Sequence, residues 1–110
     1  MRRTFKELPA FTRLVRTGKI PDRVLKDIQH DIMTRGGDVI GGTGGLKKIR
    51  TALTARGKSG GARTIYADYP ARNLVVLVTA YFKSMKVDLT TDERNALSLM
   101  KARLDRQIGA

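Results

Sequence analysis

Six glycines fall within ten residues, at positions 36–45, and they separate two parts of the chain with different hydrophobic patterns. Upstream, apolar residues recur at intervals of three and four, which is the spacing of a buried helix face. Downstream, short apolar runs alternate with turn residues, as strands do. A stretch so rich in glycine loses too much conformational entropy to form a regular element. We therefore predict a loop at 36–45 that joins a helical segment to a strand-rich one.

The segment before the glycines predicts one short strand and two helices. A strand pattern covers residues 2–7. Pro9 then suits the first turn of a helix that Gly18 ends. A second helix begins near Pro21 and stops at Gly36, and one apolar stripe runs along it, formed by Val24, Leu25, Ile28 and Ile32.

After the glycines, three runs have strand character: residues 46–53, 62–69 and 74–82. Their connections are short, so we expect an antiparallel meander with 74–82 as the central, doubly covered strand. Thr90 and Glu93 form a capping box that starts a last helix, and its apolar stripe is Leu97, Met100, Leu104 and Ile108. This order predicts an α+β fold in one domain, residues 1–110, with two N-terminal helices and a C-terminal helix packed on a small, mostly antiparallel sheet.

Charge is the compositional feature that most restricts function. The chain carries 22 Lys and Arg against 10 Asp and Glu, a formal net charge of +12. Such a surplus attracts polyanions, nucleic acid above all. Six cations and no acid lie between Asp38 and Asp68, namely Lys47, Lys48, Arg50, Arg56, Lys58 and Arg63. The C-terminal stretch mixes signs, as a solvated helix face does, so the central cluster predicts the nucleic-acid site.

Composition also restricts the compartment and the chemistry. The chain has no cysteine, which excludes disulfides, thiolate catalysis and Cys-based zinc sites. No apolar run approaches the roughly 18 residues of a membrane span. The N-terminus, Met-Arg-Arg-Thr, is not followed by the apolar region of a signal peptide. We expect a cytoplasmic protein without membrane contact.

Few acid–base groups are available for catalysis. His30 is the only histidine, and the carboxylates are scattered, so neither a two-imidazole ribonuclease site nor a two-metal site is expected. The glycine run lacks the spacing of a phosphate-binding loop. We expect no metal and no cofactor. Lys, Arg and Tyr could instead cleave RNA by stabilising the charge that develops when a ribose 2′-OH attacks its own 3′ phosphate. The same cations could simply bind the RNA backbone, and the charge pattern alone does not separate these readings.

A resemblance to a known family adds to this interpretation. Residues 38–50, D-V-I-G-G-T-G-G-L-K-K-I-R, resemble the hallmark of the HigB branch of the RelE-like toxins. Residues 57–66, G-K-S-G-G-A-R-T-I-Y, look like that family's next conserved run, and Y-F-K at 81–83 and D-L-T at 88–90 follow in order. The resemblance covers nearly the whole chain. It implies the family fold, a small curved sheet with two N-terminal helices and a C-terminal helix.

The resemblance also implies an activity, partners and site residues. Members of the family are ribosome-dependent mRNA endonucleases that need no metal ion. Each is neutralised by a cognate antitoxin, which in the HigB branch usually carries a helix-turn-helix DNA-binding domain. Carried over by position, the catalytic candidates are Lys48, Arg50, Arg63, Tyr81 and Lys83. We assign RNA contacts to the other cations of the cluster, Lys47, Arg56 and Lys58.

Three departures from the family pattern leave alternatives open. Ser59 replaces a frequent basic residue, Ala67 a frequent tyrosine and Phe82 a frequent glycine. A catalytically attenuated RNA- or ribosome-binding module is therefore one alternative. A gyrase-inhibiting toxin of the ParE branch, which shares the fold, is the other. The clustered Lys48, Arg50, Arg63, Tyr81 and Lys83 favour the endonuclease.

Overall fold

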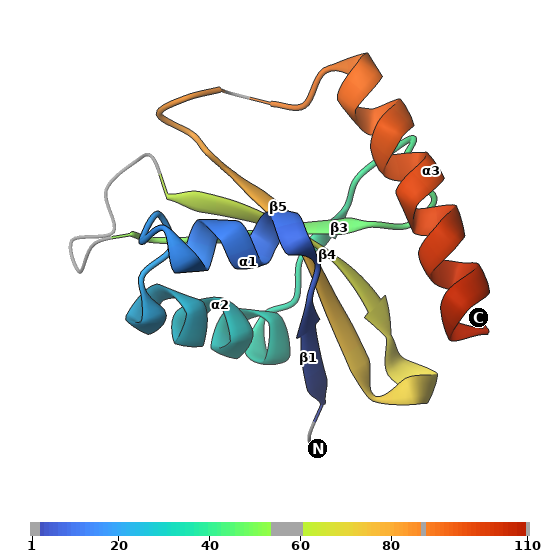
Figure 1. The fold of residues 1–110 in the computed structure, drawn as a ribbon, viewed down its shortest axis with the longest axis horizontal. Coiled ribbons are helices and arrows are strands. Elements are labelled where there is room, and N and C mark those ends of the chain that lie inside the picture. Colours follow the sequence, from blue (N-terminus) through green and yellow to red (C-terminus); the bar gives the residue numbers. More distant parts are fainter. Residues whose placement is uncertain (1–2, 54–60, 87, 110) are drawn as a thin grey trace.

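The computed structural model describes residues 3–53, 61–86 and 88–109. Within these ranges, three helices enclose a five-stranded mixed sheet in the order β1-β5-β4-β3-β2 (Figure 1). The predicted α+β class, with two N-terminal helices and one C-terminal helix, is confirmed. The elements are β1 (Thr4–Glu7), α1 (Pro9–Arg16), α2 (Asp22–Thr34), β2 (Asp38–Val39), β3 (Lys47–Thr51), β4 (Ala62–Tyr69), the short 3₁₀ helix η1 (Pro70–Arg72), β5 (Leu74–Phe82) and α3 (Thr91–Ile108). None of the helices described is long and apolar enough to cross a membrane.

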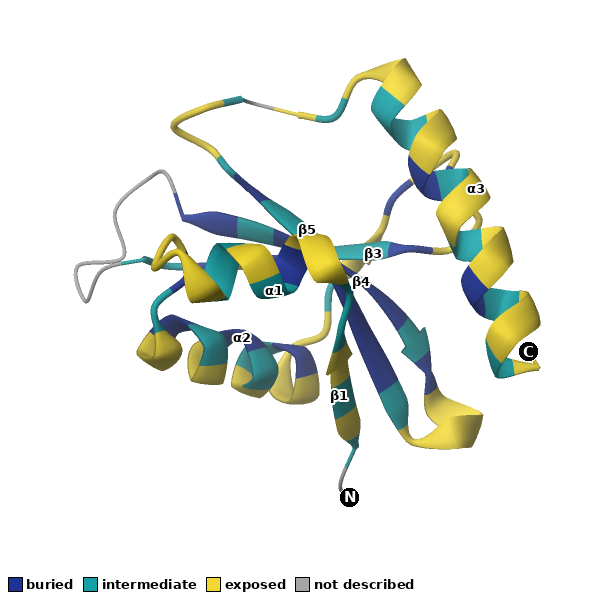
Figure 2. Ribbon diagram, viewed as in Figure 1, coloured by how far each residue is buried: buried dark blue, intermediate teal, exposed yellow. Residues whose placement is uncertain are grey.

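Helices α1 and α2 cover one face of the sheet, and their inward side is buried as the periodicity predicts (Figure 2). Phe11 of α1 and the stripe of α2 pack against alternate residues of β3, β4 and β5. This core contains Phe11, Ile20, Val24, Ile28, Ile32, Ile49, Tyr66, Val75 and Leu77. His30 of α2 is exposed on the opposite side of that helix.

Helix α3 covers the other face. The capping box is confirmed: the Glu93 backbone N–H donates to the Thr90 hydroxyl at 3.1 Å, and the Thr90 N–H donates to Glu93 Oε1 at 2.8 Å. Leu97 and Leu104 are buried against the sheet, and Ile108 packs at the margin. Met100 was wrongly placed in this stripe, because it is 38% exposed.

The predicted antiparallel meander of β3, β4 and β5 is confirmed. The rest of the sheet adds three features that the sequence did not predict. β1 lies beside β5 and pairs with it in parallel. The glycine run was wrongly assigned entirely to a loop, since Asp38 and Val39 form the edge strand β2 opposite Lys48 and Lys47. The central strand is β4, with β5 between it and β1. Strand β3 is shorter at both ends than the predicted strand 46–53.

The later part of the glycine run, from residue 40, is the turn of the β2–β3 hairpin. Gly42, Gly44 and Gly45 have positive φ angles, which glycine adopts at little cost. Thr43 is fully buried, and its hydroxyl donates to the Ile40 carbonyl at 2.6 Å. These contacts explain the glycine content without a bound phosphate.

A β-bulge in β5 sets the orientation of the last part of the sheet. Ile65 pairs with Thr79 and Tyr66 pairs with Leu77, so Val78 is an extra residue without a partner in β4. Val78 and Tyr81 both belong to the core beneath α3, although regular alternation would place them on opposite faces. The bulge therefore turns Tyr81 toward α3.

Candidate functional site

Four of the predicted catalytic residues lie on one face of three adjacent strands. Lys48 and Arg50 alternate along β3, Arg50 stands directly opposite Arg63 of β4, and Arg63 stands directly opposite Tyr81 of β5. Directly paired residues of antiparallel strands point to the same face. Neighbouring strands are about 4.8 Å apart, so the row Arg50–Arg63–Tyr81 spans roughly 10 Å. We call Lys48, Arg50, Arg63 and Tyr81 the basic row.

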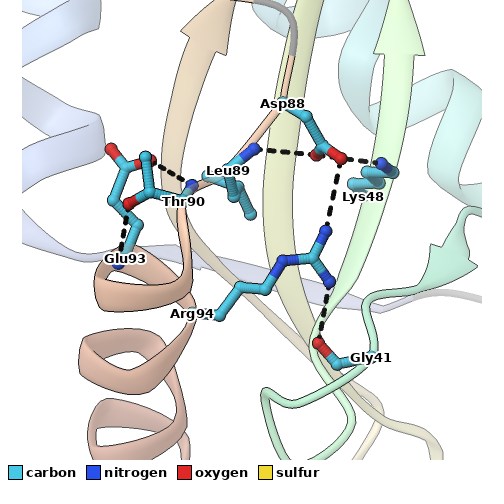
Figure 3. A network of polar contacts seen from close by, with 7 residues as sticks. All are labelled: Gly41, Lys48, Asp88, Leu89, Thr90, Glu93 and Arg94. Atoms are coloured by element: carbon cyan, nitrogen blue, oxygen red, sulfur yellow. Dashed lines mark hydrogen bonds and ion pairs between the residues drawn. The ribbon is translucent and has the colours of Figure 1, made fainter.

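The ammonium group of Lys48 is held by a network of polar contacts at the start of α3 (Figure 3). Lys48 Nζ lies 3.7 Å from Asp88 Oδ1, and Asp88 Oδ2 lies 3.3 Å from Arg94 Nη2. Arg94 Nη1 donates in turn to the carbonyl of Gly41 at 3.0 Å. The network thus joins β3, the glycine turn and α3.

Asp88 is a carboxylate that contacts the basic row, through Lys48. Its Oδ1 accepts a hydrogen bond from the Leu89 backbone N–H at 2.7 Å. That hydrogen bond, together with the positive charge of Lys48, lowers the pKa of Asp88 below its ordinary value. Asp88 is therefore ionised at neutral pH.

The two arginines of the row differ in exposure. Arg63 is half-buried, and its Nη1 lies 3.4 Å from the carbonyl of Gly61 at the start of β4. Arg50 is exposed, and its backbone carbonyl accepts a hydrogen bond from Arg35 Nη2 at 2.6 Å. This contact fixes β3 to the end of α2, so the backbone beneath Arg50 is held from the other face.

Tyr81 closes the row but is not an open stacking surface. Its side chain is 8% exposed, and Lys86 Nζ lies 5.8 Å from the ring centroid. A cavity of about 260 Å³ lies beside the ring between β5 and the first turns of α3. Its lining includes Tyr81, Ile65, Thr79, Leu89 and Leu97.

Lys83, the fifth catalytic candidate, does not lie on β5 with Tyr81. β5 ends at Phe82, and Lys83 begins the turn in which the Met85 N–H donates to the Phe82 carbonyl at 2.8 Å. The Lys83 side chain is exposed, while its backbone N–H lies 3.4 Å from the Gly61 carbonyl. Lys83 is therefore close to the start of β4 through its backbone.

Lys47 is the one RNA-contact candidate among the described residues, and it does not lie on the face of the basic row. Lys47 alternates with Lys48, so it points to the face that α1 and α2 cover, where its Nζ lies 3.8 Å from Asp68 Oδ2. Asp68 also pairs with Arg3 on that face. Arg56 and Lys58, like Ser59, lie outside the described residues.

Sequence reasoning missed Asp88 and Arg94 as parts of the site. Arg94 belongs to the mixed-sign stretch that was interpreted as a solvated helix face. The available signal was the D-L-T run at 88–90, because an acid next to a helix start can serve a neighbouring cation as well as the helix. In residues 3–53, 61–86 and 88–109, no group of three His, Cys, Asp or Glu side chains could hold a metal ion.

The arrangement suits a phosphodiester more than a small neutral ligand. Three cations stand on one face within two strands, and guanidinium groups bind phosphate oxygens through two parallel hydrogen bonds. Groups fixed in this way can stabilise negative charge that grows during a reaction.

Comparison with known families agrees with this geometry. A family described as the RelE toxin of the RelE / RelB toxin-antitoxin system matches residues 2–108. The matched stretch contains the whole basic row, Asp88 and Arg94.

Proposed function

Because the chain belongs to the RelE toxin family of toxin–antitoxin systems, we propose that it is an endoribonuclease that cuts mRNA on the ribosome and thereby stops translation. The observation that carries this proposal is the basic row, in which Arg50 and Arg63 stand opposite each other with Lys48 and Tyr81 on the same face. The glycine-rich run at 38–50 favours the HigB branch. We place the activity in the cytoplasm, with residues 1–110 acting as one toxin domain.

The proposed reaction is attack of a ribose 2′-OH on the adjacent phosphorus. The 2′-oxygen–phosphorus bond forms, the bond from phosphorus to the 5′-oxygen breaks, and a 2′,3′-cyclic phosphate and a 5′-hydroxyl result. Arg50 and Arg63 would stabilise the charge on the phosphorane oxygens. An arginine stays protonated, whereas a lysine can exchange a proton. We therefore assign to Lys48 the transfer of the proton that the 2′-oxygen loses and the 5′-oxygen gains, and we propose that no metal or other cofactor takes part.

The partners follow from the family and the charge. Electrostatic attraction between a chain of net charge +12 and the ribosomal RNA would bring the toxin to its substrate. A cognate antitoxin, with a helix-turn-helix DNA-binding domain if the chain is of the HigB branch, would neutralise it. Ribosome affinity should fall steeply as salt is raised, because each phosphate contact releases counterions.

The experiment is expression without antitoxin, followed by primer extension on a translated reporter. We expect growth arrest and new 5′ ends inside translated codons, and no new ends on the same transcript without a start codon. Arg63→Ala serves as the inactive control. DNA damage with intact mRNA would instead support the ParE-type alternative. Ribosome binding without cleavage would support the attenuated module.

The metal requirement is tested with purified ribosomes. We expect cleavage to continue when transition metals are removed and magnesium is kept only at the level that holds ribosomes together. Strict dependence on added zinc or manganese would contradict the proposed chemistry.

A further inference from the structure

We propose that Asp88 is a positioning residue whose carboxylate holds the ammonium group of Lys48 at the basic row. The catalytic consequence of this inference rests on the proposed function, whereas the positioning itself does not. Asp88 precedes α3, and Lys48 lies on β3, so the contact joins two segments that are far apart in the sequence (Figure 3).

The two carboxylate oxygens of Asp88 have separate tasks. Oδ1 lies 3.7 Å from Lys48 Nζ and accepts the Leu89 N–H at 2.7 Å. Oδ2 faces Arg94 Nη2 at 3.3 Å. A carboxylate fixed by a backbone N–H on one oxygen and by a guanidinium on the other presents a defined direction to the lysine.

The groups behind Asp88 are themselves fixed. Arg94 is tied to the Gly41 carbonyl at 3.0 Å, which links it to the turn that precedes β3. The capping box holds Thr90 and Glu93 at the helix start, and Lys86 pairs with Glu93 on the other side. The support for Asp88 thus comes from the glycine turn, from the β5–α3 connection and from α3.

Lys48 needs such support. Its side chain is 34% exposed and has a flexible four-carbon stem, which carries substantial rotamer entropy. A proton-transfer group must be held close to the reacting atoms, and misplacement by about 1 Å can cost on the order of 100-fold in rate. Asp88 restricts where the Lys48 ammonium can lie.

A purely structural role for Asp88 at the helix start is the competing explanation. Acids near a helix N-terminus are favourable, but Asp92 and Glu93 already occupy the first turn of α3. A carboxylate beside a site for phosphates also repels the substrate. Asp88 therefore weakens substrate binding, and we infer that its ordering of the Lys48 side chain offsets this loss.

The test compares Asp88→Asn with Asp92→Asn. Both remove one exposed carboxylate at the start of the same helix, but only Asp88 contacts Lys48. The first readout is the NMR order parameter of the Lys48 Cε methylene group in the free protein. The exposed side chain of Lys26 serves as the reference. We expect Lys48 to become as mobile as Lys26 in Asp88→Asn and to stay ordered in Asp92→Asn.

The second readout separates turnover from binding on ribosomes. We expect kcat to fall about tenfold or more in Asp88→Asn while KM stays level or falls, because a repulsive charge is lost. Asp88→Glu should recover part of kcat, and Asp92→Asn should match the wild type. The melting temperature of each variant shows whether the fold is kept.

Three results would overturn the proposal. Unchanged Lys48 order in Asp88→Asn would show that the carboxylate does not hold the lysine. Faster turnover or tighter binding without loss of kcat would show that Asp88 merely competes with substrate. Equal losses in both Asn variants would indicate a general helix-start effect. If the wild type cleaved no mRNA, the proposed function would fail, and the order measurement would still decide the positioning.

Discussion

Arg50 of β3 and Arg63 of β4 stand directly opposite each other in the antiparallel ladder and point to the same face of the sheet. Like charges at opposite positions destabilise a sheet by up to about 1 kcal/mol. The arrangement is thus unfavourable for folding and favourable for an anion placed between the two guanidinium groups. Under the proposed function, this local cost to stability would provide the positive charge that the phosphate needs.

Arg63→Ala should abolish cleavage and leave the fold intact. Loss of a guanidinium that acts on the developing phosphorane charge should lower the single-turnover rate on the order of 100-fold or more. The melting temperature should stay level or rise slightly, since the repulsion with Arg50 is removed. Both quantities are measured on one preparation.

Arg63→Lys should recover only part of the rate, because one ammonium group cannot make the two parallel bonds of a guanidinium. The alternative role for Arg63, an ion pair with Asp68, is not what the structure shows, since Asp68 pairs with Arg3 and Lys47 on the other face. Normal cleavage by folded Arg63→Ala would remove this residue from the mechanism.

Lys48→Ala and Lys47→Ala form a matched pair on opposite faces of β3. The two side chains are almost equally exposed, at 34% and 33%, and each faces one carboxylate. Lys48→Ala should lose cleavage, whereas Lys47→Ala should keep most of it and lose at most about 1 kcal/mol of stability with its ion pair. Ribosome-dependent cleavage assays check this. Equal loss of cleavage in both variants would show that the total charge of the protein matters and that the face of β3 on which the lysine lies does not.

Gly37→Ala should destabilise the hairpin beneath Lys48. An added Cβ would lie 2.4 Å from the Lys48 carbonyl oxygen and 3.0 Å from the Tyr66 hydroxyl, to which the Gly37 N–H donates at 2.7 Å. Such crowding costs about 1–3 kcal/mol. Gly41→Ala is the control, because the nearest atom to its Cβ would be Arg94 Nη1 at 4.0 Å. Urea unfolding of both variants tests the difference, and equal stability would contradict the close approach.

Asp105 should make the docking of α3 dependent on pH. Its pKa is lowered by hydrogen bonds from Lys101 Nζ, at 2.8 and 3.0 Å, and from the Tyr69 hydroxyl, at 2.8 Å. A carboxyl whose folded pKa lies below its unfolded value of about 4 stabilises the fold above that pH, and the contribution is lost as the pH falls through the folded pKa. The stability difference between wild type and Asp105→Asn should thus be largest near neutral pH and shrink on acidification.

Tyr69→Phe tests the same contact from the sheet. Burial and the hydrogen bond to Asp105 raise the pKa of Tyr69, so its hydroxyl remains a donor throughout this range. Loss of a hydrogen bond to a charged acceptor should cost about 1.5–3 kcal/mol at neutral pH. The free energies of unfolding of the wild type, Asp105→Asn and Tyr69→Phe are compared from pH 7 to pH 3. Differences that stay constant over this range would contradict the assignment.

The sequence predicted the elements that depend on local patterns. The stripe on α2, the capping box of α3 and the three longer strands follow from spacing and turn residues alone. β2 could not be found in this way, because two residues form a strand only when a hairpin partner is present. The parallel pairing of β1 with β5 depends on contacts between distant segments.

The site was predictable to the extent that strand alternation determines it. Alternation on β3 separates Lys47 from Lys48 by face, although Lys47 was assigned to RNA contact in the same cluster. It could not place Tyr81, because the run from Leu74 to Val78 is apolar at every position, and such a run does not reveal where a bulge lies. Asp88 and Arg94 were not predicted from the sequence as parts of the site, because their contacts depend on where α3 crosses the sheet.

Val78 divides β5 into two stretches whose inward and outward positions are set independently. If β5 kept its length but paired with β4 without the bulge, either Tyr81 would turn toward α1 and α2 or Val75 and Leu77 would turn toward α3. Such a change of pairing would exchange a whole set of side chains between the two faces, whereas a substitution alters one. A relative that lacks one residue at this point would instead pair regularly with β4 and keep both faces, so it could assemble the same row without a bulge.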